Sequence, residues 1–316
     1  MPVDYTYRAD HVGGLIAPAA LSDALSRHAR GELDADGLRQ AEDAAVKAVL
    51  EMQKAVGLAV ASDGELRRND AASLRGDTLA KGEAAYLKAQ ARLPIKVTVP
   101  APRPAAGASI EQALESAAVV KREMQALIAT GVDYVQFDAP GYAALLNAEG
   151  RDALKAQGVD PNKRLDDLLR LDAAALSGLE RPADIRIAVN VSRANGRSIS
   201  TAADCLAAAE RMFNGLAADR FLVAFDEGAN FEPLRLVPKG KLVAMGLINA
   251  VTPALEDVEA VLTRIDDAAK VVDGYTLAVC PNYSFGGNGS ALSETDQRRK
   301  LDLVVDVATR WWGFAM

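Results

Sequence analysis

Side chains that act as soft metal ligands are scarce in this chain, because its 316 residues include only 2 His and 2 Cys. His11, His28, Cys205 and Cys280 stand singly, with neither C-x-x-C nor H-x-x-x-H spacing. A structural zinc site usually takes four such ligands at close spacing, and two cysteines cannot staple a chain of this length. The sequence therefore predicts no metal site and no cofactor, zinc included, and it gives no indication for or against folate.

Polar residues with other chemistry follow directly after short apolar runs. These polar segments are residues 11–14, 63–70, 137–142, 190–196, 225–227 and 280–287. If the runs are parallel strands of a barrel, their carboxyl ends meet at one mouth, where such enzymes place their sites. We therefore expect the polar side chains of these segments to form a single site.

The elements that would position this site are eight short apolar runs alternating with helical stretches. The runs are residues 11–18, 58–62, 95–99, 134–137, 185–191, 221–225, 242–248 and 276–280, and they suit strands buried on both faces. Helical spacing of apolar residues marks 36–56, 110–129, 165–179, 202–216, 255–271 and 294–311, with Ser293 capping the last. This pattern predicts an α/β fold, a (β/α)8 TIM barrel spanning 1–316 as one domain, with a helical excursion around 80–94. A doubly wound open sheet is the alternative.

Composition limits the partners. Acidic residues outnumber basic ones by 43 to 36, which disfavours binding to nucleic acid. The longest apolar runs fall well short of the roughly 20 residues of a membrane helix, and the first residues lack the layout of a secretory signal. We expect a cytoplasmic protein with a small-molecule substrate and no nucleic-acid or membrane partner. The sequence leaves a homodimer open.

Six colinear segments together resemble one enzyme family. They are RADHVGG, SDGELRRND, YVQFDAP, NFEPLR, GLINAVTPALE and the terminal DQRRKLDLVVDVATRWWG. They are similar to the cobalamin-independent methionine synthases, in particular to short single-barrel members that match the catalytic half of the full-length enzyme. The resemblance spans almost the whole chain and implies a TIM barrel of the kind shared with uroporphyrinogen decarboxylases. In that family a zinc ion activates a thiol, usually that of homocysteine, for alkyl transfer.

The positions that hold zinc in the family carry other residues here. The H-x-C ligands become Asn190 and Ser192, the ligand Glu falls at Ala224, and the last Cys becomes Tyr283. None of these is a good zinc ligand. Cys280 lies three residues before Tyr283, an offset that on a strand would point it to the opposite face, and it is interpreted as a small buried apolar residue. The resemblance therefore implies a divergent member that lacks the zinc ligands.

Other parts of the family's site persist. By the resemblance, Glu65 and Asp138 match acids that hold the substrate's amino group. Gly13 and Gly14 match backbone that meets the substrate carboxylate, although Gly14 replaces a Ser. This pattern is typical of a substrate pocket that survives after its metal site has changed.

Roles follow for the candidate residues. His11 could act as general acid or base near neutral pH, and Tyr283 could protonate a leaving group. We predict His11, Asp138, Tyr283 and Arg193 as catalytic groups, with Arg193 clamping a carboxylate. The predicted substrate-binding residues are Gly13, Gly14, Glu65, Tyr142, Asn190, Ser192 and Asp226.

Three hypotheses of function remain open. The first is a metal-free enzyme of the lyase, decarboxylase or isomerase type, or one that transfers a methyl or alkyl group, acting on a small polar or carboxylate-bearing molecule. Uroporphyrinogen decarboxylases share the superfamily fold and work without metal, which is an argument by fold alone. The second is a zinc-dependent transferase with unorthodox ligands. The third is a non-catalytic protein that binds a small molecule.

Overall fold

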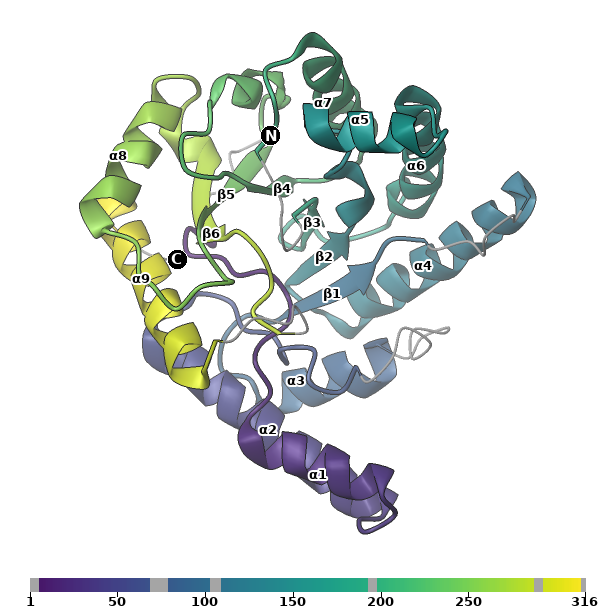
Figure 1. Cartoon of the computed structure of the whole chain (residues 1–316). Coiled ribbons are helices and arrows are strands. Elements are labelled where there is room, and N and C mark those ends of the chain that lie inside the picture. Colours follow the sequence, from purple (N-terminus) through teal and green to yellow (C-terminus); the bar gives the residue numbers. More distant parts are fainter. Residues whose placement is uncertain (1–5, 69–78, 103–108, 193–197, 287–291, 314–316) are drawn as a thin grey trace.

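A parallel sheet forms the centre of the molecule in the computed structural model, which describes residues 6–68, 79–102, 109–192, 198–286 and 292–313. Within these residues the strands are β1 (Lys96–Pro100), β2 (Tyr134–Asp138), β3 (Arg186–Asn190), β4 (Arg220–Ala224), β5 (Leu242–Ile248) and β6 (Leu277–Pro281). They follow one another in sequence order and every pair is parallel. Figure 1 shows them in the middle of the molecule with helices outside.

Two further segments extend this sheet through single bridges. Ala9 pairs with Val279 of β6, and Ala61 pairs with Ile95 just before β1. Eight parallel positions with helices around them make a TIM barrel, as the alternation of runs and helices predicts. The first two positions are bridges instead of strands.

The predicted strand at residues 11–18 is therefore wrong, since the paired residue Ala9 precedes it, and the predicted strand at 58–62 is wrong in its extent, since Ala61 is its one paired residue. In the first, Gly13 has a φ of +46°, which takes the chain out of an extended conformation. In the second, the Gln53 side chain accepts from the Ser62 N–H and donates to the Ser62 carbonyl. A helix side chain thus satisfies the backbone groups that a strand partner would otherwise bind.

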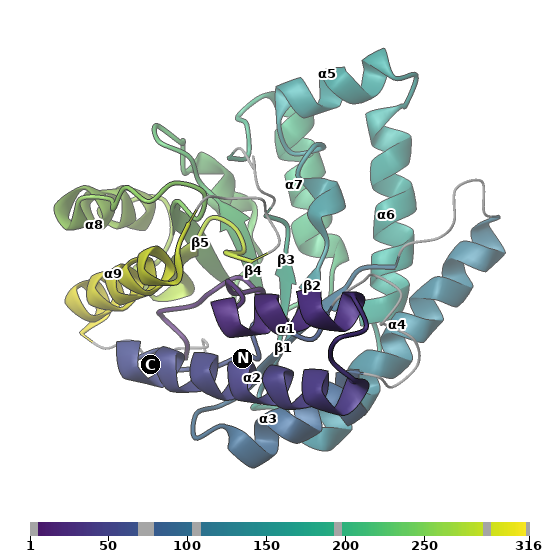
Figure 2. The ribbon, with the colours of Figure 1, turned by 60° about the horizontal axis from the view of Figure 1, so that its bottom comes forward.

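The helices that the structure describes surround the strands. They are α1 (Ala19–Ala29), α2 (Ala35–Val56), α3 (Ala85–Gln90), α4 (Ile110–Thr130), α5 (Ala148–Ala156), α6 (Pro161–Leu176), α7 (Ala203–Gly215), α8 (Val258–Ala269) and α9 (Glu294–Trp312). All six predicted helices are present, and α1 and α5 are additional. A π-helix at Leu79–Ala84 (η2) leads into α3, in the region of the predicted excursion. The helices α1 and α2 contact each other and form a hairpin (Figure 2).

Helix ends follow from local side chains. Ser293 caps α9 by accepting from the N–H of Asp296, whose side chain in turn accepts from the Ser293 backbone. Ser109 and Gln112 make the same reciprocal capping box at α4. Such caps fix where a helix begins, and the start at Ser293 is confirmed. No helix among the described residues is both long and apolar enough to cross a lipid bilayer.

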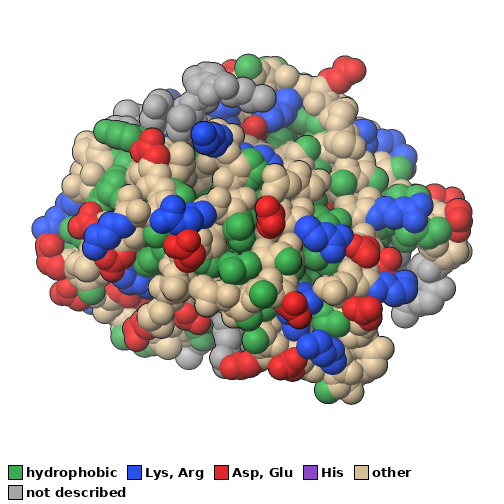
Figure 3. All heavy atoms as spheres, turned by 90° about the horizontal axis from the view of Figure 1, so that it is seen from above, with side chains coloured by type: hydrophobic (Ala, Val, Ile, Leu, Met, Phe, Trp, Pro, Cys, Tyr) green, Lys and Arg blue, Asp and Glu red, His purple; other side chains and the backbone are tan. Residues whose placement is uncertain are grey.

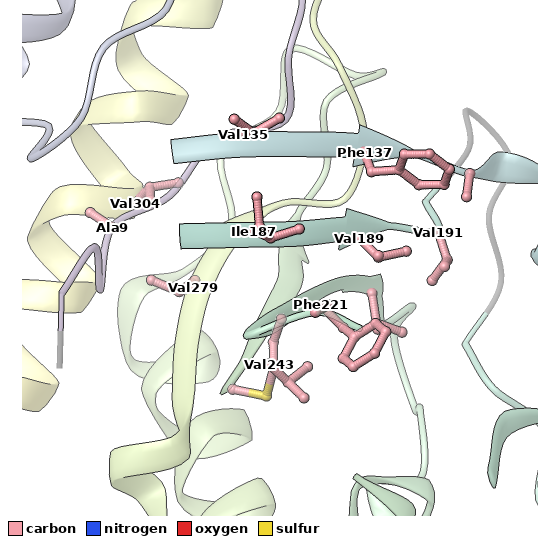
Figure 4. Packing of buried hydrophobic residues seen from close by; sticks show 14 of the residues in the cluster. Ala9, Val135, Phe137, Ile187, Val189, Val191, Phe221, Val243, Val279 and Val304 are labelled. Atoms are coloured by element: carbon pink, nitrogen blue, oxygen red, sulfur yellow. The ribbon is translucent and has the colours of Figure 1, made fainter. Parts of the chain in front are cut away.

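The outer face of the strands carries the main apolar core. Alternate residues such as Val135, Ile187 and Val279 belong to this core on the helix side of the strands, and Val304 of α9 lies near Ala9 in the same core (Figure 4). Period-two alternation puts the intervening residues inside the barrel. A separate inner cluster includes Ala188, Ala244, Ala278 and Cys280.

A charged layer fills one level of the barrel interior. The Asp10 carboxylate accepts from Lys96 Nζ at 2.8 Å, from the Tyr134 hydroxyl at 2.9 Å and from Arg220 Nη1 at 3.1 Å. All four residues are fully buried. Burial alone would raise the pKa of Asp10, but the charges of Lys96 and Arg220 outweigh it and lower that pKa to about 2. Asp10 therefore stays ionised and holds two buried cations in place.

Candidate functional site

Polar side chains gather at the carboxyl ends of β1, β2 and β3. The sheet register places Thr98 beside Gln136 and, two residues further along, Asp138 beside Asn190. The period of two then points all four side chains to the same, inner face of the sheet. Glu65, from the segment after Ala61, reaches this group through the Thr98 hydroxyl, which donates to Glu65 Oε1 at 2.7 Å.

Asp138 is held as an acceptor by two amides. Gln136 Nε2 and Asn190 Nδ2 both donate to its Oδ1 atom, at 2.7 and 2.9 Å. Burial and the nearby Glu65 carboxylate raise the pKa of Asp138 to about 6, although these two hydrogen bonds act in the opposite direction. Asp138 is therefore a group that can gain or lose a proton close to neutral pH.

Glu65 has a strained backbone that its surroundings maintain. Its φ is +58°, in the left-handed region that side chains other than glycine rarely adopt. Its N–H donates to Asp63 Oδ1 at 3.0 Å, which holds the turn, while Thr98 holds the carboxylate. Strain of this kind is often found at functional sites. Glu65 is one of the two residues other than glycine with positive φ among those described.

Gly13 and Gly14 pack directly against Glu65. A Cβ on Gly13 would lie 2.3 Å from Glu65 Oε1, and a Cβ on Gly14 would lie 2.9 Å from Ser284 Oγ. The Gly14 carbonyl accepts from Ser284 Oγ, which joins the first loop to the loop after β6. Glycine at these positions therefore lets the backbone approach the carboxylate closely.

We expect Gly13→Ala to destabilise the protein by about 1–3 kcal/mol through backbone strain, with a further cost from the clash with Glu65. Gly31→Ala is a matched control, because Gly31 also has positive φ, +75°, but open space around its Cβ position. Urea unfolding measures both. A loss of stability for Gly13→Ala no larger than that for Gly31→Ala would contradict the close packing against Glu65.

Arg68 is a site residue that does not appear among the residues predicted from the sequence. It is mostly buried and pairs with Glu83 through Nε and Nη2, at 3.1 and 2.8 Å. It also donates to the hydroxyl and the carbonyl of Thr98. Glu83 lies in the π-helix η2, so a signal local to residues 63–70 could not have revealed this partner.

Asp63 is a further acidic residue beside Arg68 and Glu83. It is buried, and its Oδ2 atom has no hydrogen-bond donor within the described part of the chain. Burial and the neighbouring Glu83 carboxylate raise the pKa of Asp63 to about 7. At neutral pH part of Asp63 is protonated and able to donate to Glu83.

The positions that the family resemblance assigns to zinc ligands carry an amide, two hydroxyls and a methyl group. The Asn190 amide donates to Asp138 and accepts from the Ser192 N–H at 2.9 Å. Ser192 is buried, and its hydroxyl has no partner in the described ranges. Tyr283 lies half-buried in the loop after β6, and Ala224 ends β4. Amide, hydroxyl and methyl groups do not make a zinc site, and the described residues include no cluster of three His, Cys, Asp or Glu that could hold a metal.

Cys280 points into the barrel instead of toward this loop. It belongs to the inner cluster with Ala278 and Ala244 and is fully buried. Burial, followed by the charge of Asp10, raises the pKa of its thiol. Because β6 ends at Pro281, Tyr283 lies beyond the strand. The expectation that Cys280 and Tyr283 point to opposite faces of one strand is therefore wrong.

His11 lies inside the barrel wall. It is fully buried, and its Nε2 is 3.1 Å from Ser62 Oγ. Burial and the charge of Lys96 lower the pKa of His11 to about 3, so its imidazole is neutral at pH 7. Its Nδ1 atom has no partner among the described residues. The acid–base role stays a prediction, and in this environment His11 is suited to hydrogen bonding rather than to carrying charge.

Three further candidates lie apart from this group or outside the described residues. Tyr142 is buried beside Asp172 of α6. Asp226 is exposed and accepts from Ser198 Oγ at 2.6 Å, at the rim of a surface pocket of about 290 Å³. Arg193 lies outside the described residues. The structure therefore brings together Gly13, Gly14, Glu65, Asp138, Asn190 and Ser192, but not Tyr142 or Asp226.

The burial of Asp172 predicts that the stability of the fold depends on pH. The Tyr142 hydroxyl lies close enough to the Asp172 carboxylate to affect its pKa. Neither this hydroxyl nor Asp172 Oδ2 has a hydrogen bond of good geometry within the described ranges. Burial raises the pKa of Asp172 to about 7. Between about pH 4 and 7 the folded state thus binds a proton that the unfolded chain has released, so this group's contribution to stability falls as pH rises.

We expect Asp172→Asn to be more stable than the wild type by about 2–4 kcal/mol at pH 8, with the difference shrinking toward zero near pH 4. Urea unfolding at the two pH values measures it. Asp167→Asn, on the exposed side of the same helix, should change stability by less than about 0.5 kcal/mol at both. Parallel pH profiles for Asp172→Asn and the wild type would refute the assignment.

Comparisons with known proteins agree with the architecture. No protein-family model matches the chain. Two Bacillus subtilis proteins described as uncharacterized, YxjH and YxjG, are 27% and 28% identical over 362 residues, covering 97% of this chain and 95% of each relative.

Two solved structures share the fold. A putative vitamin-B12 independent methionine synthase from Listeria monocytogenes has a TM-score of 0.80 and 24% identity, covering 99% of this chain and 100% of that one. A B12-independent methionine synthase from Shewanella sp. W3-18-1, in complex with selenomethionine, has a TM-score of 0.72 and 20% identity, covering 96% and 97%. The chain is thus a TIM barrel with the same fold as these two methionine synthase-like proteins.

Proposed function

We propose that the protein is a barrel enzyme related to the methionine synthase-like proteins, and that its site binds a small amino acid through the ammonium group. The observation that carries this proposal is that Glu65, held by Thr98, and Asp138 lie at the same end of the barrel, where the Glu65 charge raises the pKa of Asp138. The Glu65 carboxylate raises the cost of ionising Asp138, and a cation between the two carboxylates would lower that cost. A primary ammonium supplies that charge with three donors.

The surrounding groups supply hydrogen-bond acceptors. The NH2 groups of Gln136 and Asn190 donate to Asp138. The buried Gln136 Oε1 atom has no partner among the described residues. An unpaired buried acceptor is costly, and a ligand donor would satisfy it. The backbone of Gly13 and Gly14 lies beside Glu65, where it could meet the carboxylate end of the same molecule.

The reaction we propose uses protons and not a zinc-bound thiolate. Asp138, with its pKa raised to about 6, can act as acid or base near neutral pH. The residues at the family's zinc positions are an amide, two hydroxyls and a methyl group, which do not fit zinc. The candidates are a lyase, decarboxylase or isomerase step, or methyl or alkyl transfer to an acceptor that needs no zinc.

Calorimetric titration of the purified protein tests the binding step. The common amino acids are screened first, and each binder is compared with its deamino analogue, which keeps the side chain and the carboxylate. We expect loss of the amine to weaken binding by about 10- to 100-fold, the contribution of hydrogen bonds to a charged group. Failure of every amino acid to bind, or equal binding of both analogues, would overturn the proposal.

Metal content and turnover separate the alternatives. Stoichiometric, tightly bound zinc in the purified protein would favour the zinc-dependent transferase with unorthodox ligands. Amino-acid binding without turnover of any candidate, unchanged in Asp138→Asn, would favour the non-catalytic protein.

A further inference from the structure

The Thr98 hydroxyl sits between two opposite charges at the site. Arg68 Nη1 donates to Thr98 Oγ1 at 2.6 Å, and Thr98 Oγ1 donates to Glu65 Oε1 at 2.7 Å. Arg68 Nη1 and Glu65 Oε1 are 3.8 Å apart. The ion pair is therefore linked through a hydroxyl and is longer than a direct charge-assisted hydrogen bond of about 2.7–2.9 Å.

The direction of these bonds is fixed. A guanidinium only donates, so the Thr98 oxygen accepts from Arg68 and its proton is left for Glu65. Thr98 is 1% exposed and lies on β1, so it cannot move without moving the barrel wall.

Arg68 is fixed on its other side. Glu83 takes its Nε and Nη2 donors, and the Thr98 carbonyl takes a further bond from Nη2 at 2.8 Å. Both Arg68 and Glu83 are largely buried, with side chains 12% and 8% exposed. The guanidinium is thus a rigid cation. The side chain in this group with the most room to move is that of Glu65, which is 28% exposed.

We propose that Thr98 is a positioning residue, with its hydroxyl holding the Glu65 carboxylate out of a direct ion pair with Arg68 so that Glu65 faces the ligand's ammonium. This inference rests on the proposed function. Arg68 and Thr98 set the preference for an amine without contacting the ligand. Without the hydroxyl, the 3.8 Å separation closes to a direct Arg–carboxylate pair, which satisfies Glu65 internally and turns it away from the ligand.

The test uses Thr98→Val, which keeps the shape of the side chain and removes the hydroxyl, and Thr98→Ser, which keeps the hydroxyl. We expect Thr98→Val to bind the amino acid about tenfold more weakly and to bind its deamino analogue as the wild type does. Thr98→Ser should restore the preference for the amine. Thr130→Val removes a hydroxyl hydrogen bond in α4 and controls for the general effect on stability and binding.

Two outcomes would overturn the inference: unchanged amine preference in Thr98→Val, or an equal loss for both ligands, which indicates a structural role. The proposed function fails separately, if the wild type shows no amine preference. In that case a crystal structure of Thr98→Val still tests the inference, because the inference predicts a direct Arg68–Glu65 hydrogen bond in this variant. Retention of the wild-type separation would contradict it.

Discussion

Asp10→Ala is expected to destabilise the barrel by about 3–5 kcal/mol, the cost of breaking a buried ion pair by removing one partner. Lys96 and Arg220 would lose their shared carboxylate at positions without solvent access. The Tyr134 hydroxyl would also lose its acceptor. Urea unfolding monitored by circular dichroism measures the change.

Asp23→Ala is the control for this prediction, because Asp23 forms an exposed ion pair with Arg27 at 3.8 Å. Such pairs contribute at most about 1 kcal/mol. A loss below about 1 kcal/mol for Asp10→Ala would mean that the charged layer does not stabilise the barrel.

Asp138→Asn is expected to weaken binding of the amino acid by about 10- to 100-fold, the contribution of hydrogen bonds to a charged group. The substitution keeps the size of the side chain but removes the charge. The amides of Gln136 and Asn190, which donate to Asp138, would then face an amide that can itself donate. Calorimetry on the variant and the wild type measures the ratio.

Asp226→Asn is the matched control. Asp226 is exposed and bound to Ser198, apart from the Glu65 and Asp138 group. We expect its affinity to stay within about threefold of the wild type, because exposed polar changes away from the ligand have small effects. Equal losses in both variants would show that Asp138 has no special role.

The barrel could be predicted because its signals are local. Runs such as residues 242–248 are apolar without interruption, since both faces are buried, and the structure has β5 at these residues. Ser293 marked the start of α9 because a cap is read from adjacent residues. Two predicted strands were overestimated, because Gly13 has a positive φ in the first and Gln53, on a helix, takes the backbone hydrogen bonds of Ser62 in the second. A run of apolar residues does not reveal that a helix side chain will take the place of a strand partner.

The segments at the strand ends could be located from the sequence, but the residues that support them could not. The segments that carry Glu65 and Asp138 stand after apolar runs, and the family resemblance pointed to these two acids within them. Gln136 was missed, although the alternation in YVQFD puts it on the same face as Asp138. The link from Glu83 through Arg68 to Thr98 joins three separate segments, and only the folded chain brings them together.

The face in Figure 3 carries Lys and Arg interspersed with Asp and Glu, so charge there forms no broad field of one sign. In the proposed function, selectivity for a cationic group comes from the cluster of Glu65 and Asp138, where charges lie close together and are weakly screened by solvent. This is why the account rests on Glu65 and Asp138.

The most direct measurement is a crystal structure of the protein with a bound amino acid, with anomalous data collected at the zinc edge. The account predicts the ligand's ammonium within hydrogen-bond distance of both Glu65 and Asp138, and no anomalous peak among Asn190, Ser192 and Tyr283. A zinc peak at those three residues, or an ammonium bound away from the two carboxylates, would contradict it.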